Sequence, residues 1–350
     1  MKRLFLMASA TLALSGHANA QSSITLYGLM DAGVTYTNNV TTSSGHGATT
    51  QLSSGVSQGD RWGLMGREDL GGGVHAIFRL ESGFQLSNGA LASSGTLFGR
   101  EASVGLEGPL GTVKIGRQYD LIGDTFWAYS IAGNTAAGLL AWGLPAYSAG
   151  GGTLDNRLWG DSVNNAVKYL SPSFGGLTIG AMYGFGNVAG SMATDSSMNF
   201  MLDYNRGGFH GSLAYFFQHN ATTTSNLAEY AAGASYALGG AKVFGVVTDV
   251  SLTAGNKARA TTYDGGISYF LRPTVSVGAG YQFQTRSNGL ASANQMTVGL
   301  DYFLSKSTDL YWVAAFAHDH AFGPQIQAAL GGASSTAFQT AMRIGMRHSF

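Results

Sequence analysis

Two short motifs in this sequence match patterns that can do chemistry. Residues 55–59 read Gly-Val-Ser-Gln-Gly, the pattern of a nucleophilic serine. That serine needs a strand before it and a helix after it, whereas here polar residues precede the motif and a predicted strand follows it. His318 and His320 could contact a metal, but histidines two positions apart at a loop edge are usually solvated. We therefore expect no catalytic, metal or cofactor site.

The charged residues on predicted strands are more informative. Six basic residues fall in or at the ends of the first five predicted strands: Arg61, Arg67, Arg79, Arg100, Lys114 and Arg117. Asp120 and Asp124 follow, one helical turn apart, at the start of a long segment without strand pattern. If these acids face the basic strands across a narrow opening, the opposed charges set a preference among ions.

Alternation predicts where the strand charges point. Six of them are offset by one position from apolar neighbours and should share the polar face of the sheet: Arg61, Arg67, Arg79, Lys114, Lys168 and Arg343. Arg100 has the parity of Val104 and Leu106 unless a bulge intervenes. Glu81 is a further candidate for the polar face.

The composition narrows the class of protein. The chain has 350 residues, of which 52 are Gly and none is Cys, so disulfides and thiolate metal sites are excluded. Charged residues make up only 11%, about half of what soluble domains carry. The 19 basic residues balance the 19 acidic ones, which argues against a nucleic-acid partner.

Period-two alternation continues to the end of the chain and predicts sixteen strands. They span residues 24–36, 60–69, 74–81, 98–107, 112–117, 163–170, 177–186, 199–205, 209–218, 227–237, 241–250, 260–270, 274–285, 295–303, 308–317 and 338–350. Short glycine or proline turns alternate with long polar segments, including 38–59, 118–160 and 319–337. An even strand count with short turns on one rim and long loops on the other is typical of a transmembrane β-barrel.

Aromatic residues lie at or near many of the predicted strand ends. In a barrel this wide they fit the girdles at the two membrane interfaces better than a packed core. The residues are Tyr27, Trp62, Phe78, Tyr169, Tyr183, Tyr204, Tyr269, Phe303, Trp312 and Phe350.

The first twenty residues predict a secretory signal peptide. Lys2 and Arg3 precede an apolar stretch, and Ala18-Asn19-Ala20 fits a cleavage site. The expected organisation is therefore a cleaved signal, 1–20, and a single barrel domain, 21–350. No later stretch is long and apolar enough for a helical membrane span.

Several longer stretches resemble general porins of Gram-negative bacteria, of the neisserial and beta-proteobacterial type. They are residues 23–28 (Ser-Ile-Thr-Leu-Tyr-Gly), 66–73 (Gly-Arg-Glu-Asp-Leu-Gly-Gly-Gly), 79–84 (Arg-Leu-Glu-Ser-Gly-Phe), 98–106 (Phe-Gly-Arg-Glu-Ala-Ser-Val-Gly-Leu), 116–118 (Gly-Arg-Gln), 165–172 with its Tyr-Leu-Ser-Pro turn and the terminal Gly-Met-Arg-His-Ser-Phe. The resemblance covers essentially the whole chain after the predicted signal.

The resemblance implies an all-β fold: a sixteen-stranded antiparallel transmembrane barrel in the outer membrane. It implies short periplasmic turns, long extracellular loops and an inward-folded third loop, 118–160, that narrows a water-filled channel. It also places Arg100 on the pore wall and makes the terminal Phe350 an assembly signal. The implied partners are two further copies in a homotrimer, outer-membrane lipid and lipopolysaccharide, and small hydrophilic solutes and ions.

The sign of ion selectivity and the solute remain open from the residues. The basic residues favour a weak anion preference, although Glu101 and Asp161 could also line the pore. Aromatic residues in the long segment leave a substrate-specific sugar or phosphate channel possible: Phe126, Trp127, Tyr129, Trp142 and Tyr147. A barrel enzyme is the remaining alternative, but no nucleophile and base share a predicted strand face.

Overall fold

A computed structural model describes residues 23–129, 156–219, 226–252, 257–287, 289–321, 323–326 and 332–350. The predicted signal 1–20 lies outside these residues. The strands are β1 (Ser23–Thr42), β2 (Gly45–Ser54), β3 (Arg61–Gly71), β4 (Val74–Gly83), β5 (Glu101–Gly108), β6 (Gly111–Tyr119), β7 (Ser162–Leu170), β8 (Leu177–Gly184), β9 (Ser197–Arg206), β10 (Phe209–Gln218), β11 (Leu227–Leu238), β12 (Ala241–Leu252), β13 (Ala258–Arg272), β14 (Val275–Arg286), β15 (Ala293–Phe303), β16 (Thr308–Asp319) and β17 (Phe338–Ser349). A short helix, α1 (Leu121–Phe126), follows β6.

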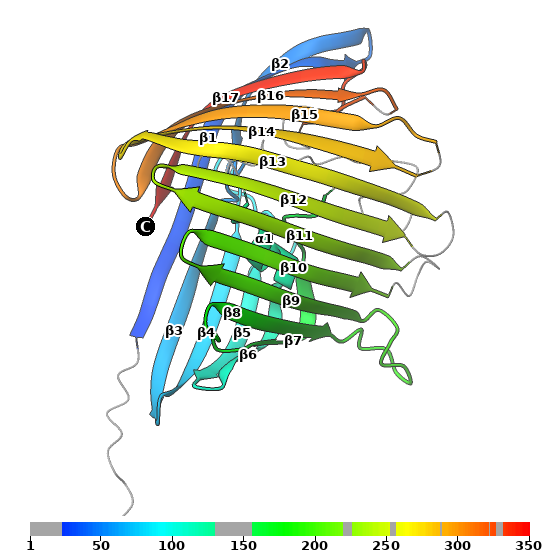
Figure 1. Cartoon of the computed structure of the whole chain (residues 1–350). Coiled ribbons are helices and arrows are strands. Elements are labelled where there is room, and N and C mark those ends of the chain that lie inside the picture. The colour runs from blue at the N-terminus through cyan, green and yellow to red at the C-terminus, as the bar shows by residue number, and fades with distance from the viewer. Residues whose placement is uncertain are drawn as a thin grey trace, which may run out of the picture.

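The strands form one closed antiparallel barrel with sixteen positions (Figure 1). From β3 to β17 each strand pairs with the next, and β1 pairs with β17 to close the ring. On its other edge, β1 pairs first with β3 and then with β2, so these two strands occupy a single position in the barrel. Seventeen strands among the described residues therefore give the sixteen-stranded barrel that the alternation predicts.

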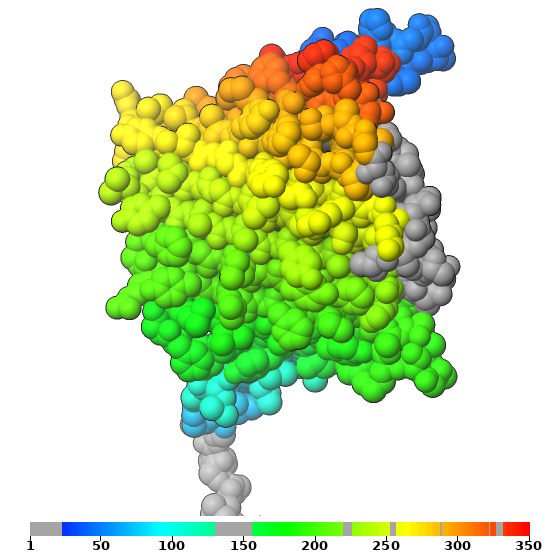
Figure 2. Space-filling view, turned by 45° about the vertical axis from the view of Figure 1, so that its right-hand side comes forward, coloured from blue at the N-terminus to red at the C-terminus, as the bar shows by residue number. Residues whose placement is uncertain are grey.

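Apolar side chains cover the outer face of the barrel because that face meets lipid. Leu26, Val104, Ile115 and Ile344 are exposed, and each lies beside strand neighbours that point inward. A charge on this face near the middle of the bilayer would cost about 2–4 kcal/mol. In the space-filling view the side chains of consecutive strands form a continuous wall (Figure 2).

The prediction of a long loop at 38–59 is wrong for residues 38–54. There β1 continues to Thr42, turns within two residues and returns as β2. Most side chains of β2 are exposed or half-buried, so the hairpin has no apolar face and shows no apolar alternation. Its strand character comes instead from β-branched residues such as Thr49 and Thr50, which favour extended backbone.

The two rims of the barrel differ as the alternation of turns predicts. Tight turns join β3 to β4, β5 to β6, β9 to β10 and β11 to β12 on one rim, here called the turn rim. Longer segments leave the opposite rim, and one of them carries α1 into the ring of strands, where it contacts β8, β9 and β10 (Figure 1). Among the described residues no helix is long and apolar enough to span a bilayer.

Candidate functional site

Strand register brings four basic side chains together on the inner face. Met65 is paired with Arg79, and Arg79 with Ser103, so odd-numbered residues of β3, β4 and β5 share one face. Across the next pairing, Gly105 lies beside Lys114. Arg61 and Lys114 therefore point to the same side as Arg79. Arg100 lies just before β5 and reaches this side too. We call Arg61, Arg79, Arg100 and Lys114 the basic wall.

Glu81 is a buried acid that lies beside three cations of the basic wall. Its carboxylate accepts a hydrogen bond from Arg100 Nε at 2.6 Å and another from the Tyr27 hydroxyl at 2.6 Å. The Nε atoms of Arg61 and Arg79 each lie 4.0 Å from it. Arg79 Nε also donates to the Tyr27 hydroxyl, at 2.8 Å. One acid thus fixes three guanidinium groups.

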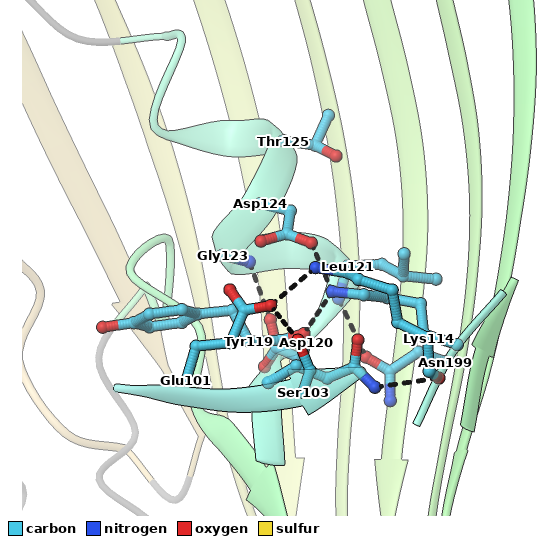
Figure 3. A network of polar contacts seen from close by, with 12 residues as sticks. Glu101, Ser103, Lys114, Tyr119, Asp120, Leu121, Gly123, Asp124, Thr125 and Asn199 are labelled. Carbon is cyan, nitrogen blue, oxygen red and sulfur yellow. Dashed lines mark hydrogen bonds and ion pairs between the residues drawn. The ribbon is translucent and has the colours of Figure 1, made fainter. Parts of the chain in front are cut away.

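Glu101 is the second acid beneath the wall (Figure 3). It accepts hydrogen bonds from Lys114 Nζ at 2.7 Å and from the Ser103 hydroxyl at 2.6 Å, and Arg79 Nη1 lies 3.5 Å away. Glu81 and Glu101 are directly paired across β4 and β5. Two neighbouring carboxylates are tolerated here because each is surrounded by cations.

The wall presents positive charge to the lumen. Four cations against two carboxylates leave a net charge of +2 (4 − 2). The side chain of Arg79 is 41% exposed, whereas those of Glu81 and Glu101 are each 7% exposed. The acids therefore lie beneath the cations, and a solute in the lumen meets the cations first.

Two of the six predicted basic residues lie apart from the wall. Arg67 points inward but is paired with Glu107 at 2.9 Å close to the turn rim. The prediction for Arg117 is wrong. The unbroken pairing of β5 with β6 places Arg117 opposite Ala102, on the outer face, and its guanidinium donates to the carbonyl of Gly99 and to Asn164 Oδ1. Alternation from the inward-facing Lys114 gives the same face, because strand residues three positions apart point to opposite sides of the sheet.

Two further predicted lumen residues face inward but are enclosed. Lys168 is 2% exposed and forms an ion pair with Asp124 at 2.5 Å. Arg343 is also 2% exposed, with Asp31 Oδ1 3.5 Å away, and it donates to the hydroxyls of Thr35 and Ser53. Both cations hold parts of the barrel together, so neither adds free charge to the lumen.

Asp120 does not face the basic wall as predicted. It is fully buried at the N-cap of α1, where its carboxylate accepts from the backbone N–H groups of Gly123 at 2.7 Å and Asp161 at 2.8 Å (Figure 3). Burial raises its pKa to about 6, although Arg157, 3.7 Å away, opposes that shift. An N-cap carboxylate satisfies helix N–H groups that would otherwise lack partners, so Asp120 shapes this segment.

The start of segment 118–160 is fixed to the inner wall by apolar and ionic contacts. Ile122 and Phe126 are fully buried in a cluster that includes Phe216 of β10 and Val246 of β12. Asp124, 41% exposed, binds Lys168 at the edge of the basic wall. Near the other end, Arg157 binds Glu229 of β11 at 2.9 Å. The described ends of the segment therefore pack on β7–β12.

The structure alters the prediction for Tyr27 and the aromatic residues of the long segment. Tyr27 points inward between Glu81 and Arg79 and is no part of a girdle. Its parity, opposite to Leu26 and Gly28, already indicated this. Phe126 and Tyr129 are fully buried, which removes them from an aromatic path along the lumen. Trp142 and Tyr147 lie outside the described residues.

Comparison with known proteins identifies the family. Residues 7–321 match the Gram-negative porin family. The chain is 33% identical over 357 residues to outer membrane porin protein 32 of Delftia acidovorans, covering 99% of each chain.

Solved porins have the same architecture. An anion-selective porin from Comamonas acidovorans superposes with a TM-score of 0.80 at 26% identity, covering 94% of this chain and all of that one. The trimer form of OmpT from Vibrio cholerae superposes with a TM-score of 0.70 at 14% identity, covering 94% and 99%. The relatives are channels, so the alternative of a barrel enzyme is wrong. The chain belongs to the Gram-negative porin family and is an outer-membrane porin, a β-barrel channel for passive diffusion.

Proposed function

We propose that this porin prefers anions weakly and passes ions and small hydrophilic solutes, with the basic wall at the constriction of the channel. The supporting observation is the layering of the wall: four partly exposed cations lie above two buried carboxylates. The relative from Comamonas acidovorans is an anion-selective porin, and likeness to it supports the same preference. Segment 118–160, whose start is fixed inside the barrel, forms the constriction opposite the wall.

A reversal potential tests the anion preference. With the purified porin in a planar lipid bilayer and a tenfold KCl gradient, we expect the sign that corresponds to faster chloride than potassium permeation. A fixed positive wall attracts anions less strongly as salt screens it, since the Debye length is about 10 Å at 0.1 M. The preference should therefore decline as both salt concentrations are raised together. A potassium preference would contradict the proposal.

Solute size should decide passage. Liposome swelling with a series of sugars and amino acids should give rates that fall smoothly with size. A sugar or phosphate that enters much faster than its size allows, and saturates, would favour the substrate-specific alternative. The burial of Phe126 and Tyr129 supports size-dependent passage.

We also propose a homotrimer embedded in outer-membrane lipid and lipopolysaccharide. OmpT of Vibrio cholerae, which has the same fold, forms a trimer. Single insertions into a bilayer should then close in three equal current steps. A single step from each insertion would contradict the trimer.

A further inference from the structure

A second segment leaves the barrel wall for the interior, at the break between β2 and β3. Ala32 of β1 is paired with Ser54, and Leu29 is paired with Arg61. Two residues of β1, 30 and 31, therefore lie opposite six residues, 55–60. The extra residues cannot stay in the sheet. We call segment 55–60 the inner turn.

The inner turn is buried against the inner faces of β16 and β17, which lie on the other side of β1. Val56 is 2% exposed and packs with inner-face residues Tyr311, Val313 and Ala341. Ser57 and Asp60 are each 2% exposed. The motif that resembles a nucleophilic serine turn thus belongs to a packed turn inside a channel.

Asp31 holds the inner turn from β1. Its carboxylate Oδ2 accepts from the backbone N–H groups of Ser57 at 2.5 Å and Gln58 at 3.1 Å, and its backbone carbonyl accepts from Gly55 at 2.9 Å. Its other oxygen accepts from the Tyr311 hydroxyl at 2.5 Å. Asp31 is completely buried, and hydrogen bonds from N–H groups to a buried carboxylate are strong.

Asp60 completes the attachment in the reverse direction. Its Oδ1 accepts from the backbone N–H of Asp31 at 2.6 Å, and its Oδ2 accepts from that of Leu86 at 3.1 Å. The carboxylates of Asp31 and Asp60 therefore bind each other's segments. The inner turn has two fixed ends, so its last residues have a defined position.

That position lies directly beside two arginines of the basic wall. The carbonyl of Gly59 accepts from Arg61 Nη1 at 3.1 Å. A methyl group on Gly59 would lie only 2.9 Å from Arg100 Nη1, so the Arg100 guanidinium packs closely on this glycine. Arg100 and Arg61 are thus confined between Glu81 on one side and the inner turn on the other.

We propose that the inner turn, held by Asp31, positions the guanidinium groups of Arg61 and Arg100 and thereby sets how strongly the pore prefers anions. Asp31 and Gly59 are positioning residues: neither needs to touch a permeating ion. Long arginine side chains have many rotamers, and confining them keeps their charge at one place along the pore. This inference rests on the proposed anion preference.

The test compares reversal potentials in a KCl gradient for the wild type, Gly59→Ala and Asp31→Ala, with Gly47→Ala as a matched control. Gly47 lies in the β1–β2 hairpin, where an added methyl group comes within 3.2 Å only of the Thr42 side chain. Gly59→Ala displaces Arg100 without changing any charge. We expect the chloride-to-potassium permeability ratio to fall by roughly twofold in Gly59→Ala, half the logarithmic effect of removing an arginine charge. Asp31→Ala should lower it too, although the loss of a negative charge by itself favours anions.

The outcomes separate this inference from the proposed function. If the wild type prefers anions and Gly59→Ala leaves the ratio unchanged in a folded channel, the positioning role of the inner turn is wrong. A ratio that does not fall in folded Asp31→Ala removes Asp31 from that role. A wild type without anion preference contradicts the proposed function itself. If Asp31→Ala does not fold, Gly59→Ala still decides, because its alanine displaces only the end of a flexible side chain.

Discussion

The basic wall and the two acids beneath it differ in exposure according to the sign of their charge. Glu81 and Glu101 are almost buried, and each contacts at least two cations. An isolated charge would be costly to bury, but these acids keep their charge because hydrogen bonds and guanidinium groups replace water. Their burial leaves the cations as the surface that solutes meet.

Changing Arg79→Ser should weaken the anion preference. Arg79 is the most exposed cation of the wall, and a unit charge about 5 Å from a passing ion contributes about 0.8 kcal/mol in water, so the permeability ratio should fall roughly two- to fourfold. The measurement is the reversal potential in a KCl gradient. Arg67→Ser is the matched control, because Arg67 is neutralised by Glu107 near the rim. Equal losses in both variants would contradict a local role for the wall.

Changing Glu101→Gln should have the opposite effect. The substitution keeps the shape of the side chain and raises the net charge of the wall from +2 to +3, so chloride permeability should rise relative to potassium. Ser103 and Lys114 can still donate to the amide oxygen. A lower ratio in the same salt gradient would show that Glu101 acts mainly by holding Arg79 and Lys114 in place.

At the scale of elements, α1 shows how a six-residue helix can be stable inside a channel. So short a helix is unstable alone because nucleation is costly. Here Ile122 and Phe126 bury apolar surface against the wall, and Asp120 caps the first turn. Gly160, with φ of 60°, packs against Asp120 and Gly123. Capping and packing therefore fix the start of segment 118–160.

Changing Asp120→Ala should loosen segment 118–160. Loss of an N-cap costs about 0.5–2 kcal/mol, and the bond to Asp161 is lost as well. We expect more frequent brief closures in single-channel recordings at constant voltage. Asp120→Asn should fall between the wild type and Asp120→Ala, since its amide oxygen still caps the helix but its amide nitrogen cannot accept from the N–H of Asp161. Equal closure rates in both variants would exclude the capping role.

For the whole molecule, closure of the barrel depends on the pairing of its first and last strands. The N–H and carbonyl groups of Phe350 pair with those of Gly28 at 3.0 and 3.1 Å. Its ring packs on Gly28 so closely that a Cβ there would lie 2.4 Å from the ring. The terminal residue thus contributes both backbone pairing and packing at the seam.

Changing Phe350→Ala should lower the yield of folded barrel, in agreement with the proposed assembly signal. Folded barrels resist SDS at room temperature and migrate differently after boiling, so gel mobility measures the folded fraction. Phe270→Ala is the control, since it removes an equally exposed aromatic ring from the end of β13, away from the seam. Identical folded fractions would show that the ring at position 350 is dispensable for assembly.

The sequence by itself determined the repeating parts of this protein. Alternation of apolar and polar residues follows directly from the two-sided geometry of a strand, so it predicted sixteen positions and the rim with tight turns. It also predicted the inward faces of Arg61, Arg79 and Lys114, because a charge on the lipid face is costly. Strands without an apolar face, such as β2, could not be predicted from alternation.

Only the tertiary structure decided which charges meet. Asp120 is buried at the start of α1, and Arg117 donates to the carbonyl of Gly99 and to Asn164, so neither contributes to the basic wall. Glu81 fixes three arginines because β3, β4 and the segment before β5 meet there. Such contacts join residues far apart in the chain, and a bulge or an inward turn changes them without altering any local pattern.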